Sequence, residues 1–183
     1  PMLADLAEEA LQVAKRVKRD TSLGVGALSM ASLAANELQA HLEGKSTAVI
    51  ALVGSGLMTR KLAKNVQDAG LGRLLFVNRT LEKARALADE FGGRAVSLDD
   101  FRAHPAEVDA IISATAAPDP VFDAHFLAAL PHSGSRVLCV DLAIPRDFSP
   151  EFDHDPRVLL VDIPVLKSRG NGNLRQKFIE ATK

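Results

Sequence analysis

The chain has 183 residues, of which 47% are hydrophobic and 25% are charged, and its formal net charge at pH 7 is −1. This composition excludes a disordered chain, and the near-neutral charge gives no overall attraction to nucleic acid or to anionic membranes. No apolar run reaches the roughly 20 residues of a membrane-spanning helix, and a lone cysteine excludes a disulfide within the chain. A cytoplasmic, reducing setting with no membrane contact is therefore expected.

The first 45 residues are predicted to be helical. Apolar residues recur every three or four positions over residues 3–19, as on one face of an amphipathic helix. The glycine-containing segment 21–26 interrupts this pattern, and a second helix, rich in alanine and leucine, is predicted over about 28–42.

From residue 46 onward, short apolar strands alternate with helical segments. A continuous apolar run at 49–53 predicts a strand that is covered on both faces. Alternation of this kind predicts an α/β fold, a doubly wound, Rossmann-like parallel sheet in the order 3-2-1-4-5-6. The other predicted segments are strands at 73–77, 94–96, 108–113, 136–142 and 157–161, a helix at 81–90, and a further helix that begins at residue 173 after the glycine break "SRGNG".

A glycine turn follows the first strand and reads Gly54, Ser55, Gly56, Leu57, Met58, Thr59. Glycines at the first and third positions allow a sharp turn and a close approach of the backbone to a pyrophosphate, which the N-terminus of the next helix would bind. Thr59 stands where a third glycine normally lets helix and strand pack closely. The segment is interpreted as a nucleotide-binding turn, the alternative being a plain connection between strand and helix.

The second strand ends in Asn78, Arg79 and Thr80, with no carboxylate before Glu82. A site for NAD usually has an acidic residue here, which accepts hydrogen bonds from the ribose hydroxyls. An arginine instead favours a 2′-phosphate, so the predicted cofactor is NADP. The alternative is a solvated arginine at the start of a helix.

Two later segments follow strands four and five. After strand four, Ala114, Thr115 and Ala116 are small enough for a nicotinamide ribose to lie against their backbone. After strand five, Pro145 and Arg146 are predicted to shape the far wall of the same crevice. Such proline-containing turns also occur for packing reasons alone.

The sequence indicates neither a metal site nor a nucleophile. None of the five histidines has the spacing of metal ligands. Cys139 lies inside an apolar strand and is predicted to be a buried core residue.

Taken together, these motifs resemble the NADPH-binding domain of glutamyl-tRNA reductase, an enzyme of tetrapyrrole (porphyrin) biosynthesis. The combination of "NRT" with "DLAIPRD" is more specific than the glycines, and Ala14 stands where that family usually has a glycine. The matching segments, in the family's order, are "ALQVAKRVKRDTSLGVGALSMASLAANEL", "GSGLMT", "NRTLEKARALADEFGG", "SATAAPDPVF", "DLAIPRDFSP", "VDIPVLK" and "NLRQKFIEATK".

The resemblance implies three parts and a reaction. Residues 1–45 would be a helical linker from an N-terminal catalytic domain, 46–166 the NADP-binding Rossmann domain, and 167–183 the start of a helix that leads to a dimerisation domain. In that family a cysteine of the catalytic domain attacks the glutamyl ester of charged tRNA, and NADPH reduces the thioester to glutamate-1-semialdehyde. The chain is thus expected to be a fragment that holds the cofactor and contains no catalytic residue. Its implied partners are glutamyl-tRNA, bound through the catalytic domain, a second subunit in a homodimer, and the next enzyme of the pathway.

Two alternatives remain open. One is a shikimate-dehydrogenase-like oxidoreductase, which shares the "NRT" arrangement. The other is a non-catalytic module that senses a nucleotide, with Thr59 as a mark of a decayed site.

Overall fold

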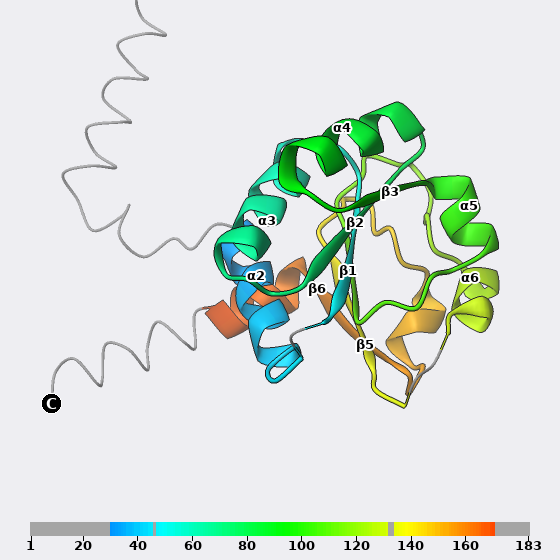
Figure 1. Cartoon of the computed structure of the whole chain (residues 1–183). Helices are drawn as coiled ribbons and strands as arrows, with labels where there is room; N and C mark the ends of the chain where they lie inside the picture. The colour runs from blue at the N-terminus through cyan, green and yellow to red at the C-terminus, as the bar shows by residue number, and fades with distance from the viewer. Residues whose placement is uncertain (1–29, 46, 132–133, 171–183) are drawn as a thin grey trace, which may run out of the picture.

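The fold was analysed in a computed structural model, which describes residues 30–45, 47–131 and 134–170. The helices predicted at 3–19 and from residue 173 lie outside these residues. Within them, one six-stranded sheet runs through the centre and is covered by helices on both faces (Figure 1).

All paired strands of this sheet are parallel, and their order is β3-β2-β1-β4-β5-β6. The predicted order 3-2-1-4-5-6 is therefore confirmed. The central strands are apolar throughout because helices cover both of their faces. The six strands are β1 Val49–Val53, β2 Arg73–Asn78, β3 Arg94–Ser97, β4 Ala110–Ser113, β5 Val137–Asp141 and β6 Val158–Asp162.

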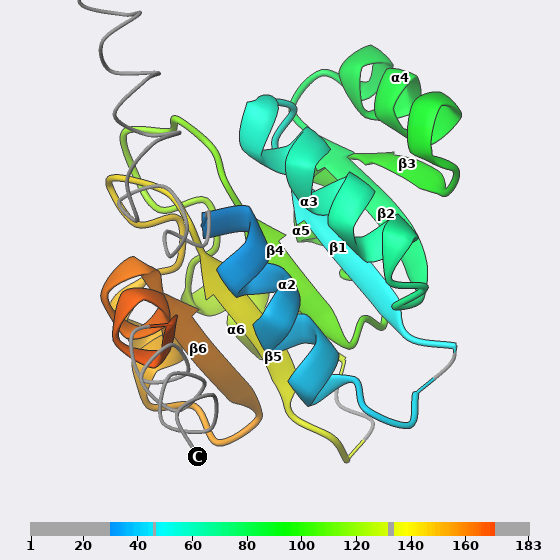
Figure 2. The same cartoon turned by 90° about the vertical axis from the view of Figure 1, so that its left-hand side faces the viewer.

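The helices form two layers, which Figure 2 shows from the side of the first layer. That layer contains α2 (Met30–His41), α3 (Leu57–Asp68) and α4 (Leu81–Phe91), whose apolar residues share one buried cluster with the sheet. The second layer contains the short helices α5 (Leu98–Ala103) and α6 (Ala124–Ala129) and the 3-10 helix η2 (Pro150–Asp153).

The second layer is held together largely by phenylalanines. Phe122 lies 4.6 Å from Phe126 and 4.9 Å from Phe148 between ring centroids. Phe148 in turn lies 5.0 Å from Phe152 of η2. Because these rings come from α6, η2 and the loops before them, they fix the loop after β5 against the loop before α6.

The end of the described chain differs from the sequence prediction. Residues 163–170 are helical, so residues 168–170 of the predicted glycine break belong to a helix, whereas the helix predicted from residue 173 lies outside the described residues. Gly170 packs against α2, and a Cβ there would lie only 2.6 Å from Cδ2 of Leu33. The glycine thus allows two helices to approach closely. The predicted domain boundary between residues 166 and 167 falls inside this helix.

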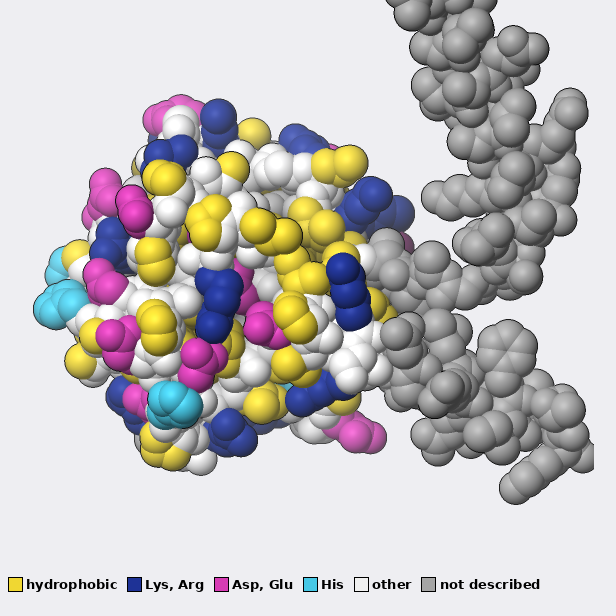
Figure 3. All heavy atoms as spheres, turned by 180° about the vertical axis from the view of Figure 1, so that it is seen from behind, with side chains coloured by type: hydrophobic (Ala, Val, Ile, Leu, Met, Phe, Trp, Pro, Cys, Tyr) yellow, Lys and Arg dark blue, Asp and Glu magenta, His cyan; other side chains and the backbone are white. Residues whose placement is uncertain are grey.

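Charged side chains of both signs are interspersed on the face that Figure 3 shows, in keeping with the net charge of −1. Among the described residues, no helix is both long and apolar enough to cross a membrane.

Candidate functional site

The glycine turn joins β1 to α3 at the carboxyl edge of the sheet. Gly54 has a φ of +111°, and a Cβ there would lie 2.7 Å from the carbonyl oxygen of Ala114. Its N–H donates a hydrogen bond of 2.9 Å to the carbonyl of Val77 in β2. Only glycine meets both conditions, because L-residues rarely adopt this φ and any side chain would strike the backbone.

Gly56 has a different role. It is the N-cap of α3, and a Cβ at this position would meet no atom within 4 Å. The N-terminus of α3 therefore has free space in front of it, on the side where a helix end attracts an anion.

These residues line a cavity of about 320 Å³ between the carboxyl ends of β1, β2 and β4. The structure brings together nine of the twelve residues that the sequence predicted for cofactor binding: Gly54, Ser55, Gly56, Asn78, Arg79, Thr80, Ala114, Thr115 and Ala116. In a parallel sheet this edge is where ligands bind, since the strand order reverses between β1 and β4.

The other three predicted residues, Leu57, Met58 and Thr59, do not line the cavity. The Leu57 side chain is 69% exposed, and Met58 packs against the core. Thr59 is buried, with its hydroxyl 3.4 Å from the position of a Gly54 Cβ and without a hydrogen-bond partner among the described residues. The side chain that replaces the third glycine therefore faces the turn and the core.

The wall formed by the end of β2 is exposed and basic. Asn78 accepts a hydrogen bond of 3.0 Å from the Thr80 N–H, which shapes the turn into α4. Among the residues that the structure describes, none pairs with the Arg79 guanidinium. Lys83, one turn into α4, lines the same cavity and was missed in the sequence. Its position in the first turn of the helix that follows Arg79 was the available signal, since that turn begins at the same edge of the sheet.

No carboxylate occurs among the described residues that line this cavity, whereas Arg79 and Lys83 both carry positive charge. The cavity is therefore electropositive at the β2 side and suits an anion there.

The opposite wall, residues 114–117 after β4, is tied to the loop after β5. The Asp147 carboxylate accepts hydrogen bonds from the Ser113 hydroxyl at 2.6 Å, the Thr115 hydroxyl at 2.6 Å and the Thr115 N–H at 3.1 Å. Both Asp147 and Ser113 are fully buried. This wall is thus positioned by a residue that is not itself part of the cavity lining.

The prediction that Pro145 and Arg146 shape the far wall is wrong, because neither lines the cavity. Arg146 instead forms an ion pair of 2.9 Å with Asp153 in η2. Its Nε also lies 3.9 Å from the buried Asp141 carboxylate. The loop therefore directs its arginine toward its own carboxylates and away from the cavity.

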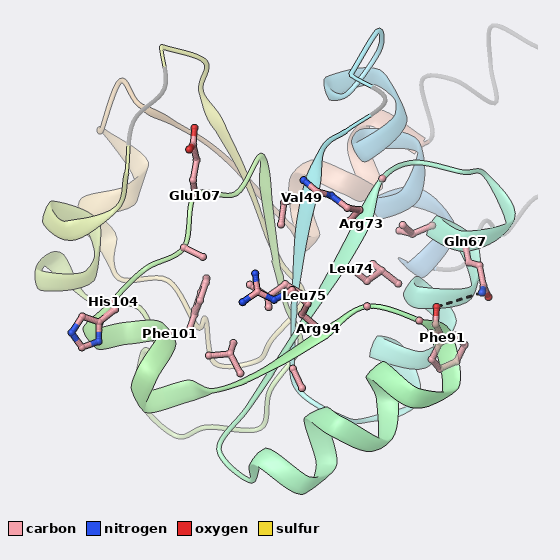
Figure 4. Close-up of a pocket in the computed structure, with 17 residues that line it drawn as sticks. Val49, Gln67, Arg73, Leu74, Leu75, Phe91, Arg94, Phe101, His104 and Glu107 are labelled. Atoms are coloured by element: carbon pink, nitrogen blue, oxygen red, sulfur yellow. Dashed lines mark hydrogen bonds between the residues drawn. The ribbon is translucent and has the colours of Figure 1, made fainter.

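A larger cleft, of about 720 Å³, lies at the amino ends of β1, β2 and β3 and contains none of the twelve predicted residues (Figure 4). Its lining includes Arg73 and Arg94, with His104 and Glu107 from the segment after α5. The last turn of α3, with Val66 and Gln67, also faces it, and a helix C-terminus disfavours an anion. The smaller cavity is the better nucleotide site, because it combines a helix N-terminus with two cations that pair with none of the described residues.

Cys139 is fully buried in β5, as the sequence predicted. Burial raises the pKa of its thiol, and the charge of the nearby Asp141 adds to the shift. A buried thiol of raised pKa is not available as a nucleophile. The described residues also contain no group of three or more His, Cys, Asp or Glu side chains that could hold a metal.

Residues 35–168, which make up more than half of the chain, match a family model described as shikimate / quinate 5-dehydrogenase. The chain belongs to this family. A solved member, shikimate 5-dehydrogenase from Thermus thermophilus, is 25% identical with a TM-score of 0.50, over 77% of this chain and 53% of the other. That structure is described as a complex with NADP(H) and shikimate.

The curated homologues of the chain are glutamyl-tRNA reductases, so the resemblance found in the motifs is confirmed. The protein of Methanococcoides burtonii is 33% identical over 183 residues, covering 100% of this chain and 43% of the relative. That of Rhodopirellula baltica is 35% identical, covering 97% of this chain and 42% of the relative. The chain thus spans less than half the length of these relatives. As a function, the shikimate-dehydrogenase-like alternative is not better supported than glutamyl-tRNA reductase.

Solved structures agree with this result. The glutamyl-tRNA reductase of Methanopyrus kandleri is 31% identical with a TM-score of 0.73, over 96% of this chain and 45% of the other. The nucleotide-binding domain of the Thermoplasma volcanium enzyme, at 18% identity and a TM-score of 0.60, covers 83% of this chain and 98% of its own, and shows the common fold. The match to a dehydrogenase family supports a nicotinamide cofactor as the ligand class.

Proposed function

We propose that the chain is the NADPH-binding domain of a glutamyl-tRNA reductase. The observation that carries this proposal is the cavity at the carboxyl edge, where the open N-terminus of α3 lies beside Arg79 and Lys83. The whole-chain similarity to glutamyl-tRNA reductases supports the same function. The proposal includes the reducing, cytoplasmic setting expected from the sequence.

The cavity fits a dinucleotide with a 2′-phosphate. The free space before Gly56 admits a pyrophosphate, which the N–H groups of the first turn of α3 would bind. Arg79 and Lys83 would bind the 2′-phosphate, and residues 114–117 would lie along the nicotinamide half. NADPH, when bound, supplies the hydride for the reduction.

The contribution of this chain to the reaction is to bind and orient the cofactor. The acyl transfer from glutamyl-tRNA would take place in a separate catalytic domain, as would recognition of glutamate. Glutamyl-tRNA, a second subunit and the next enzyme of the pathway are partners of the whole enzyme under this proposal.

The proposal is tested by the cofactor preference of the variant Arg79→Ala. A charge-assisted hydrogen bond contributes roughly 1.5–3 kcal/mol, so this variant should bind NADPH about 10- to 100-fold more weakly. The affinity for NADH should hardly change, since NADH has no 2′-phosphate. Calorimetric titration of both cofactors measures the difference.

Arg85→Ala is the matched control, because Arg85 is an exposed arginine on α4, the helix that follows Arg79, and does not line the cavity. This control should leave both affinities unchanged. Equal losses of NADPH and NADH affinity in Arg79→Ala would refute the NADP assignment. Failure of the unmodified chain to bind either cofactor would favour a non-catalytic module.

A further inference from the structure

The segment after β4 depends on one buried carboxylate. Asp147, which is 34 residues from Ser113 in the sequence, accepts three hydrogen bonds from Ser113 and Thr115. The Thr115 hydroxyl donates its only proton to Asp147, so its lone pairs are free to accept the Ala117 N–H at 3.1 Å. The chain of hydrogen bonds that begins at Asp147 therefore orients both Thr115 and Ala117, which line the cavity.

Asp147 is itself held in place by a second buried carboxylate. Asp141, at the end of β5, accepts hydrogen bonds from the N–H groups of Asp147 at 3.0 Å, Phe148 at 3.1 Å and Ala143 at 3.1 Å. The Asp147 carbonyl accepts a further bond of 2.8 Å from the Phe122 N–H. The position of the Asp147 carboxylate is thus fixed from both sides by the backbone of its own loop and by the start of the next layer.

The two carboxylates have different electrostatic surroundings. Burial raises the pKa of Asp141 above its ordinary value, and its three N–H donors only partly oppose this shift. The Asp147 carboxyl group receives two hydroxyl donors and one N–H donor. An amide in its place would direct its NH₂ group at one of these donors.

The wall that Asp147 holds also contacts the glycine turn. The carbonyl oxygen of Ala114 lies 2.7 Å from the position of a Gly54 Cβ, and the Ala114 N–H donates to the Val53 carbonyl at 3.1 Å. Ala114 therefore has little room to move, because it is held against β1 and the glycine turn. The conformation of residues 115–117 depends on the bonds that Thr115 makes.

We propose that Asp147 is a positioning residue for the nicotinamide half of the cofactor, which it orients by fixing Thr115 and Ala117. It touches no part of the cofactor, and it has no contact with the wall formed by Asn78, Arg79 and Lys83. This inference rests on the proposed function. It assigns the motif "DLAIPRD" to the support of the cavity wall, with Asp141 holding Asp147 and Asp147 holding Thr115.

The test compares the whole cofactor with its adenosine half. Asp147→Asn should lower the affinity for NADPH by about 10-fold, the effect of losing one hydrogen bond to a charged group. The affinity for adenosine 2′,5′-bisphosphate, which reaches only the Arg79 wall, should change by less than about 2-fold. Calorimetric titration of the full chain with both ligands measures the two values.

Thr115→Val provides a milder variant with the same shape, in case Asp147→Asn does not fold. It removes the hydroxyl of residue 115. Asp147 still accepts hydrogen bonds from the N–H of residue 115 and from the Ser113 hydroxyl. NADPH affinity should fall by a few-fold, again without effect on adenosine 2′,5′-bisphosphate. The double variant should bind NADPH no more weakly than Asp147→Asn, because both changes break the same connection. The control is Asp153→Asn, which alters a carboxylate of the same region that pairs with Arg146 outside the cavity.

The outcomes separate the possible explanations. Equal losses of both ligands would mean that Asp147 only stabilises the fold, and unchanged NADPH affinity in both variants would mean that the wall does not need it. Either result overturns the inference about Asp147, but the proposed function of the cavity as the NADPH site still holds. If the unmodified chain binds neither ligand, the proposed function itself fails, and the inference fails with it.

Discussion

The two walls of the cavity are built in opposite ways. At the end of β2, Arg79 and Lys83 stand exposed, and none of the described residues pairs with them. At the end of β4, Thr115 is fixed through a buried carboxylate that belongs to the loop after β5. The first wall offers positive charge to a ligand. The second wall offers a backbone whose conformation is fixed before the ligand binds. A dinucleotide needs both, because its phosphates are recognised by charge and its reacting ring by position.

The glycine turn connects the two walls. Gly54 is the point where the walls meet, since its N–H bonds to β2 and its Cα faces the Ala114 carbonyl. A change there should affect both halves of the cofactor, whereas a change in either wall should affect only one.

The largest effect is expected from Gly54→Ala. The methyl group would lie 2.7 Å from the Ala114 carbonyl oxygen, at a φ of +111° that alanine rarely adopts. We expect the free energy of unfolding to fall by about 3 kcal/mol, at the upper end of the range for backbone strain. Chemical denaturation measures this loss, and the affinities for NADPH and adenosine 2′,5′-bisphosphate should fall together.

Gly56→Ala is the matched control for that variant. A methyl group at Gly56 meets no protein atom within 4 Å, and its φ of −77° suits alanine. The free energy of unfolding should fall by only about 0.5–1 kcal/mol, because glycine is a better N-cap than alanine, while NADPH affinity falls because the methyl group takes up space needed by the pyrophosphate. A Gly54→Ala variant as stable as Gly56→Ala would show that the two walls can move apart freely.

A smaller effect is expected from Cys139→Ser, which tests whether the strand leading to the Asp141 loop has any chemical role. The hydroxyl would lie in a fully buried apolar site, so the free energy of unfolding should fall by about 2 kcal/mol. Binding of NADPH should be kept, because Cys139 lies within the strand and outside the cavity lining.

The thiol itself provides a second measurement. Since burial raises its pKa, Cys139 should resist alkylation until the protein unfolds. Rapid alkylation of the folded chain, or loss of NADPH binding in a stable Cys139→Ser variant, would contradict the assignment of this residue to the core.

The smallest effect is expected at Thr59, whose hydroxyl is buried without a hydrogen-bond partner among the described residues. Thr59→Val keeps the shape and removes the unpaired hydroxyl, so the protein should become more stable by about 1 kcal/mol. Thermal unfolding measures this gain. Weaker NADPH binding by this variant would instead show that the hydroxyl turns to the phosphates when the cofactor binds.

Thr59→Gly separates the steric effect from that of the hydroxyl. If the threonine keeps α3 too far from β1, the glycine variant should bind NADPH more tightly, despite a cost of roughly 1 kcal/mol for glycine inside a helix. Tighter binding of Thr59→Gly together with unchanged binding of Thr59→Val is the result expected from steric displacement. Weaker binding by both variants would exclude it.

The sequence by itself determined the parallel sheet, its strand order and most of the exposed wall. The continuous apolar strands and the alternation with helices were enough for the order 3-2-1-4-5-6, because right-handed crossovers leave few topologies. Gly54, Gly56 and Arg79 could be predicted because each lies just after a strand and acts through a local property: a positive φ, a missing side chain and a charge, respectively.

Only the tertiary structure decided what the segments after β4 and β5 do. Pro145 and Arg146 had the composition of a cavity wall, but a side chain's direction depends on contacts with distant residues, here Asp153 and Asp141. The bonds from Ser113 and Thr115 to Asp147 span more than 30 residues and leave no periodic signal in the sequence. The sequence likewise predicts a break between helices at Gly170, whereas this glycine is helical and packs against Leu33 of α2. Local pattern fixes where a strand ends, whereas the packing of the second layer fixes which of the residues beyond that end face the ligand.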